Sequence, residues 1–104
     1  MNYTENYKGI KIDVQAVDIT IAEEVQQEIR KVIDKIEPRI SSVNFADVYF
    51  NIEKNDPVRN KRVSMRLGIP GNDLFAEETG EHWVPVLKEI EEKLLRQLEK
   101  REKS

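Results

Sequence analysis

The sequence lacks cysteine entirely and has a single histidine, His82. Disulfide bonds, thiolate metal sites and cysteine–histidine catalytic pairs are therefore excluded. One histidine alone cannot build a metal centre, so we predict that the chain binds no metal. The 104 residues also contain no apolar run near the twenty or so that cross a bilayer. Together with a start that lacks a signal-peptide pattern, this predicts a cytoplasmic protein without a membrane partner.

Glycine is scarce as well, with four residues in the chain. Gly68, Gly71 and Gly80 are spaced as turn and boundary residues, so no glycine-rich phosphate loop is present. Glutamates gather near the expected helix starts, where the helix dipole favours them. We therefore predict no enzymatic activity, no cofactor and no small-molecule substrate.

Charge, by contrast, is abundant in both signs. Seventeen Lys and Arg residues against twenty Asp and Glu give a formal net charge of −3. Nucleic-acid-binding domains are usually basic. A nucleic-acid partner therefore requires that the positive charges be gathered on one part of the surface.

Hydrophobic spacing predicts four strands and two helices. A helix is expected between the capping-box signature Thr20-Ile21-Ala22-Glu23 and Pro38, and a second helix from about Glu81. The alternating segments that predict strands are residues 8–15, 43–54, 62–69 and 74–79.

The predicted order is β-α-β-β-β-α. Four half-buried strands and two amphipathic helices indicate an α+β fold, a two-layer sandwich in which both helices pack on one face of a four-stranded sheet. We expect one domain over residues 8–104, preceded by a disordered segment at residues 1–7.

Basic residues gather in the C-terminal halves of both predicted helices. The first helix carries Lys31 and Lys35 away from its apolar stripe, and Arg39 follows its end. The second helix carries a longer row: Lys93, Arg96, Lys100, Arg101 and Lys103. The helix dipole alone favours such cations by about 0.3–1 kcal/mol each, which would leave them merely solvated. If the helices pack side by side and parallel, these charges meet at one end and can hold phosphates.

A second group of residues falls on the predicted sheet face opposite the core. It consists of Tyr49, Arg62, Arg66 and Phe75. Exposed aromatic and arginine side chains can stack on bases, contact another protein or remain solvated, and the last two are favoured over RNA. The open face also leaves room for a weak homodimer.

The string Lys93-Leu94-x-Arg96-Gln97-Leu98-x-Lys100, with Ala76-x-x-x-Gly80 upstream, resembles the second helix of ribosome hibernation promoting factors. That family includes the ribosome-associated inhibitor A proteins and was formerly described as sigma-54 modulation proteins. Further matching fragments occur in the same order along the chain: Asp18-Ile19-Thr20, Lys35-Ile36-Glu37 and Ile52-Glu53-Lys54. The resemblance covers the chain from about Ile10 to Lys100.

This resemblance implies a partner and a mode of action. Such proteins occupy the small ribosomal subunit between head and body, overlap the mRNA and tRNA sites, and silence translation in stationary phase or stress. Their basic helix and loop residues face the ribosomal RNA backbone. Motif positions carry this role to Lys35, Lys93, Arg96 and Lys100, and helical geometry adds Lys31, Arg39, Arg101 and Lys103. The chain resembles the short form, without a C-terminal dimerisation domain.

The sequence also departs from the family pattern. His82-Trp83-Val84-Pro85 stands where relatives commonly carry an acidic residue followed by an apolar-aromatic pair, and several glutamates make the second helix less basic than in many relatives. An alternative function is therefore a protein-interaction module on the same scaffold that has lost strong ribosome binding. A third, the double-stranded RNA-binding domain, shares the α-β-β-β-α order but needs a basic loop that we do not find.

Overall fold

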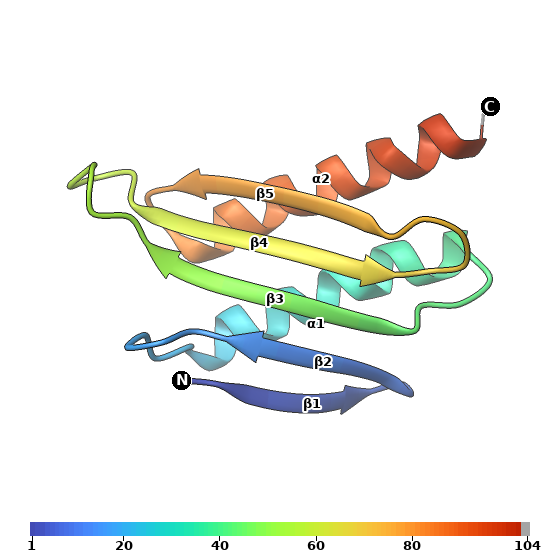
Figure 1. Cartoon of the computed structure of the whole chain (residues 1–104), viewed down its shortest axis with the longest axis horizontal. Helices are drawn as coiled ribbons and strands as arrows, with labels where there is room; N and C mark the ends of the chain where they lie inside the picture. The colour runs from blue at the N-terminus through green and yellow to red at the C-terminus, as the bar shows by residue number, and fades with distance from the viewer. Residues whose placement is uncertain (103–104) are drawn as a thin grey trace.

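Five strands form a single sheet, and two helices cover one of its faces (Figure 1). The computed structural model describes residues 1–102, the last of these by its backbone alone. A short 3-10 turn, η1, follows the first helix at Glu37–Arg39. In chain order the main elements are β1 (Tyr3–Tyr7), β2 (Ile10–Gln15), α1 (Glu23–Ile36), β3 (Phe45–Ile52), β4 (Lys61–Gly68), β5 (Leu74–Gly80) and α2 (Trp83–Glu102).

The strands lie in the sheet in their sequence order, β1-β2-β3-β4-β5. The β2 and β3 strands are parallel and are joined by α1, whereas every other neighbouring pair is antiparallel. This arrangement makes β1 and β5 the two edges of the sheet. The expected α+β sandwich with both helices on one face is therefore present.

The prediction of a four-stranded sheet was wrong, because β1 lies within residues 1–7, which were expected to be disordered. A turn at Lys8 and Gly9, both with positive φ, folds β1 back against β2. Side-chain contacts fix β1 to α1: Tyr7 donates to Asp34 at 2.8 Å, and Arg30 pairs with Glu5 at 2.7 Å. The segment Tyr-Thr-Glu-Asn-Tyr has no aliphatic alternation, which is why its pattern did not predict a strand.

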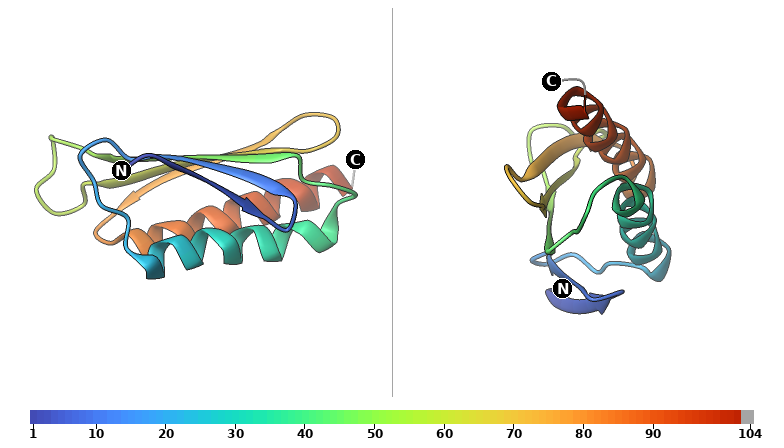
Figure 2. Two further views of the ribbon diagram at one scale, coloured as in Figure 1. Left: turned by 90° about the horizontal axis from the view of Figure 1, so that it is seen from below. Right: turned by 90° about the vertical axis from the view of Figure 1, so that its right-hand side faces the viewer.

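The core lies between the sheet and the two parallel helices (Figure 2). The buried apolar residues of α1 are Val25, Ile29, Val32, Ile33 and Ile36, and those of α2 are Val86, Leu87, Ile90, Leu94 and Leu98. Each fully buried aliphatic side chain of this kind contributes roughly 1.5–3 kcal/mol.

Helix boundaries differ slightly from the prediction. Ala22 is the N-cap of α1 and makes no side-chain capping bond, so the predicted capping box centred on Thr20 was wrong. The helix ends at Ile36, two residues before Pro38, as predicted. The second helix begins at Trp83, which places Pro85 in its first turn, where proline is tolerated.

Candidate nucleic-acid interface

Helix α2 has a groove on each side. One separates it from α1 and the other from the edge strand β5. The predicted cations Lys93, Arg96 and Lys100 of α2 all line the groove beside β5, and the cation that this helix contributes to the inter-helix groove is Lys88. The lining residues of the two grooves decide which one suits an anion.

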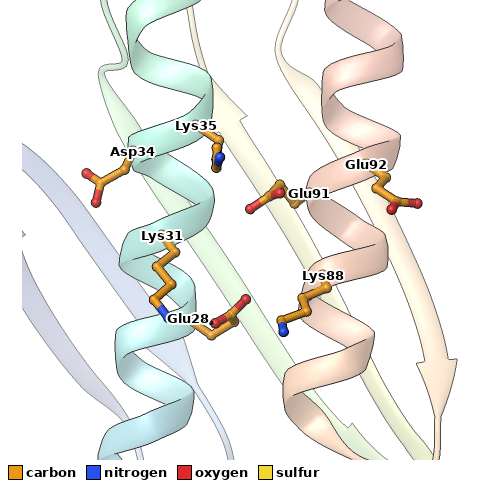
Figure 3. A pocket seen from close by; sticks show the side chains of 7 residues that line it. All are labelled: Glu28, Lys31, Asp34, Lys35, Lys88, Glu91 and Glu92. Carbon is orange, nitrogen blue, oxygen red and sulfur yellow. Dashed lines mark ion pairs between the residues drawn. The ribbon is translucent and has the colours of Figure 1, made fainter.

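The inter-helix groove lies between α1 and α2 and carries both signs of charge (Figure 3). Its volume is about 470 Å³. Its lining residues are Glu28, Lys31, Asp34 and Lys35 of α1 with Lys88, Glu91 and Glu92 of α2. Glu28 and Glu91 point into the groove beside the three lysines, whereas Asp34 and Glu92 point away from it (Figure 3). Asp34 instead pairs with Lys8 and accepts a hydrogen bond from Tyr7.

Two glutamates explain why this groove does not favour added negative charge. Glu28 is only 5% exposed, and Lys31 lies 3.8 Å from its carboxylate. Burial raises the pKa of Glu91, the charges of Glu28 and Glu92 raise it further, and Lys35 and Lys88 oppose the shift. The lysines here already compensate the neighbouring carboxylates.

The β5–α2 groove carries more positive than negative charge. It has a volume of about 460 Å³ and is lined by Phe75, Ala76, Glu77, Lys93, Arg96, Gln97 and Lys100. Three cations share this groove with one carboxylate, Glu77. The Arg62 guanidinium of β4 already forms an ion pair with that carboxylate, at 2.7 Å. A net positive, open groove beside a sheet edge is suited to a phosphate backbone.

Two of the residues that line this groove also hold the sheet edge. The Phe75 backbone N–H donates to Gln97 Oε1 at 3.1 Å, and Gln97 Nε2 donates back to the Phe75 carbonyl oxygen. Lys93 Nζ donates to the Glu77 carbonyl oxygen at 3.0 Å and pairs with Glu78 at 2.9 Å. The Glu78 carboxylate accepts a hydrogen bond from Thr79 N–H, and this bond, together with Lys93, lowers its pKa. Lys93 is thus committed to the fold.

Arg96 and Lys100 remain available in the β5–α2 groove. Both are exposed, and within residues 1–102 neither forms a salt bridge with a carboxylate. The Arg96 guanidinium makes only a 3.4 Å hydrogen bond, to the Glu92 carbonyl oxygen of its own helix. These two side chains are therefore the cations of the β5–α2 groove that the described residues do not use for ion pairs.

Arg39 and Arg101 meet in a smaller crevice of about 250 Å³ at the C-terminal end of the helical layer. Its other lining residues are Ile40, Ser41, Ile69, Pro70 and Leu98. Arg101 donates to the carbonyl oxygens of Asn72 and Asp73, at 3.0 Å for Asp73. Lys103, also a predicted site residue, lies outside the described residues.

The predicted cations therefore occupy three surfaces instead of one. The helices do lie side by side and parallel, but Glu92, Leu95 and Glu99 occupy the outer side of α2 between the two grooves. Arg96 lines this outer side as well as the β5–α2 groove. Lys31 and Lys35 fall in the inter-helix groove, whereas Arg96 and Lys100 fall on the β5 side. Helical spacing alone does not reveal which neighbouring element each side faces.

The second predicted group does share one exposed sheet face. Arg62 pairs with Glu77, and it also lies 3.5 Å from Glu53. Arg66 lies over the Phe75 ring, with Cζ 5.0 Å from the ring centroid. Sequence reasoning missed that Phe75 also lines the β5–α2 groove, because this follows from the packing of α2 beside β5.

Within residues 1–102 there is no group of three potential metal ligands. The same part of the chain has no helix with the length and hydropathy of a membrane span.

Solved structures share this fold. A ribosomal subunit interface protein from Coxiella burnetii superposes with a TM-score of 0.70 at 18% identity, over 89% of this chain and 98% of that one. The N-terminal domain of Protein Y from Thermus thermophilus also gives 0.70, at 12% identity, over 84% of this chain and 92% of that domain. At these identities the likeness establishes the fold. No curated protein sequence matches the chain.

Family membership rests on the sequence itself. The family model described as "Sigma 54 modulation protein / S30EA ribosomal protein" matches residues 12–104, which is nearly the whole chain. This match confirms the resemblance predicted from the α2 motif and the shorter fragments before it. The chain belongs to the sigma 54 modulation protein / S30EA ribosomal protein family.

Proposed function

We propose that this protein binds the small ribosomal subunit in the mRNA and tRNA channel and blocks translation in stress or stationary phase. Family membership and the name of the Coxiella burnetii neighbour, a ribosomal subunit interface protein, support a ribosomal partner. The observation that carries the proposal is the β5–α2 groove, where Arg96 and Lys100 are exposed and unpaired with carboxylates among residues 1–102. The protein acts by occlusion, in the cytoplasm, without turnover or cofactor.

The proposed RNA contacts should differ in strength, because neighbouring carboxylates compensate some of the cations more than others. Arg96 and Lys100 bind phosphates of ribosomal RNA, and Arg39 with Arg101 extends the interface around the C-terminal end of the helical layer. Lys31 and Lys35 contribute less, because carboxylates surround them. The alternative of a protein-interaction module has no comparable support, since Arg62 and Arg66 on the outer sheet face pair within the molecule.

Co-sedimentation with purified small subunits tests the proposal. We expect saturable binding that weakens from low to near-physiological salt and that bound tRNA displaces. The variant Arg96→Glu/Lys100→Glu should lose binding. Lys11→Glu/Lys54→Glu changes the net charge equally at two exposed lysines away from the groove, and it should bind like the parent. Absence of binding by the parent at low salt would reject the function, and equal loss in both variants would reject the site.

A further inference from the structure

Phe75 lies where the outer sheet face meets the β5–α2 groove. Phe75 is a large apolar residue on the edge strand β5, and it is 39% exposed. It lines the same groove as Arg96 and Lys100. On the sheet side, the Arg66 guanidinium lies over its ring at 5.0 Å from the centroid. An exposed aromatic ring thus contacts one cation on the sheet and shares a groove with two cations of α2.

The backbone of Phe75 is held in place from both sides. Its N–H and its carbonyl oxygen both bond to the side-chain amide of Gln97, and β4 pairs with it across the sheet, where Arg66 is its register partner. Arg66 is in turn held near Asp73, at 3.8 Å. The ring therefore projects from a fixed position, which reduces the conformational entropy lost when a flat partner stacks on it.

This combination matches the chemistry of single-stranded RNA binding. Proteins that bind unpaired strands join a positive groove, which follows the backbone, to aromatic rings on which bases stack. Recognition of paired RNA needs phosphate and ribose contacts but no exposed ring. The groove's carboxylate, Glu77, is occupied by Arg62 and by the Ser64 hydroxyl at 3.3 Å, so it leaves the positive field largely intact.

We propose that Phe75 stacks on one unpaired base of the RNA strand whose phosphates lie along Arg96 and Lys100. The inference rests on the proposed function and narrows it, because it requires that the contacted RNA segment be single-stranded or bulged. The RNA-binding surface then crosses the sheet edge and includes a residue of the outer face.

Tyr49 provides a matched control on the same face. Tyr49 is 48% exposed on β3, and β4 separates it from β5 and the β5–α2 groove. Its hydroxyl accepts a 3.5 Å hydrogen bond from Gln15. Substitution of either ring removes a similar exposed aromatic group from the sheet. Only the substitution at Phe75 removes one from the groove.

The experiment measures the affinity of the parent, Phe75→Leu, Phe75→Trp and Tyr49→Leu for purified small subunits. At saturating protein, hydroxyl radicals then report backbone protection of the RNA, and 2′-hydroxyl acylation reports constrained nucleotides. We expect Phe75→Leu to weaken binding about fivefold to a hundredfold, as loss of one stacked base does. One nucleotide should become reactive to acylation while backbone protection persists. Phe75→Trp should restore both readouts, and Tyr49→Leu should match the parent.

Each other outcome overturns a distinct claim. If Phe75→Leu binds and protects the RNA as the parent does, the stacking inference is wrong and the proposed function stands. If affinity falls without any change in acylation, the ring contacts a ribosomal protein and not a base. If the parent protects no RNA at all, the proposed function fails, and the inference fails with it. Thermal unfolding of each variant excludes loss of the fold as the cause.

Discussion

The two grooves beside α2 hold the same number of lysine and arginine side chains, yet they differ as anion sites. In the inter-helix groove two carboxylates, Glu28 and Glu91, point in among three lysines, and the partly buried Glu91 has a raised pKa. In the β5–α2 groove three cations face one carboxylate that is already paired, and two of them form no salt bridge within residues 1–102. The comparison teaches that local pairing, and not the number of cations on a helix, determines where phosphate can bind.

Neutralisation of equal charge in each groove should separate them most strongly. Arg96→Gln/Lys100→Gln should weaken small-subunit binding at least about 100-fold, because two charge-assisted hydrogen bonds contribute about 1.5–3 kcal/mol each. The slope of log affinity against log salt should flatten by about 1.4 to 1.8. Lys31→Gln/Lys35→Gln should stay within about threefold of the parent. Salt titrations of binding check both values, and similar losses in the two variants would contradict the assignment.

The structural contribution of the β5–α2 groove is a smaller effect. Gln97→Ala removes both side-chain hydrogen bonds to the Phe75 backbone, which should lower the free energy of unfolding by about 1–2 kcal/mol. Lys100→Ala, one turn away on the same helix, removes an exposed side chain and should change it by no more than about 0.5 kcal/mol. Urea denaturation measures the difference. Equal stabilities of the two variants would show that water replaces the two hydrogen bonds between Gln97 and the Phe75 backbone.

The smallest predicted effect concerns the free energy of unfolding, which Glu78 and Glu91 should change in opposite directions. Because Thr79 N–H and Lys93 lower the pKa of Glu78 below its usual 4.5, its ionised form stabilises the fold at neutral pH. That stability is lost as pH falls through the lowered pKa. Because burial raises the pKa of Glu91, its ionised form costs stability at neutral pH, and the cost disappears as pH falls through the raised value.

Glu78→Gln should therefore destabilise the protein at pH 7 by about 0.5–1 kcal/mol, and Glu91→Gln should stabilise it by a similar amount. Both differences should shrink as pH falls, first for Glu91, whose pKa is raised, and at lower pH for Glu78, whose pKa is lowered. Chemical denaturation at several pH values provides the measurement. A change of the same sign in both variants would contradict the opposite pKa shifts of Glu78 and Glu91.

Much of the fold could be predicted because buried aliphatic side chains recur with the period of each element. Ile29 and Ile33 on α1, or Val63 and Met65 on β4, mark one buried face directly. The β1 strand could not be predicted this way, because its inward residues are Tyr3, Glu5 and Tyr7. Tertiary hydrogen bonds and ion pairs to α1 hold that strand, and no local pattern reports them.

The site was predictable only as a set of cations. The α2 motif singled out Arg96 and Lys100, and the structure places them together in one groove. Spacing along one helix could not show that Lys93 bonds to the Glu77 carbonyl oxygen and pairs with the Glu78 carboxylate. It also could not show that Phe75 lines the same groove as Arg96 and Lys100. Those relations depend on β5 lying beside α2, and residues on separate elements meet only in the folded chain.

The closure of the β5 edge by α2 also has a consequence for synthesis. All five strands precede α2 in the sequence, yet α2 supplies the apolar cover of β4 and β5 and the side chains that occupy the β5 edge. Until this helix has left the exit tunnel, the nascent sheet exposes an apolar face and an unpaired edge, both of which favour aggregation. We therefore expect the sheet to complete its folding only after α2 has emerged, with a requirement for chaperone protection before that point.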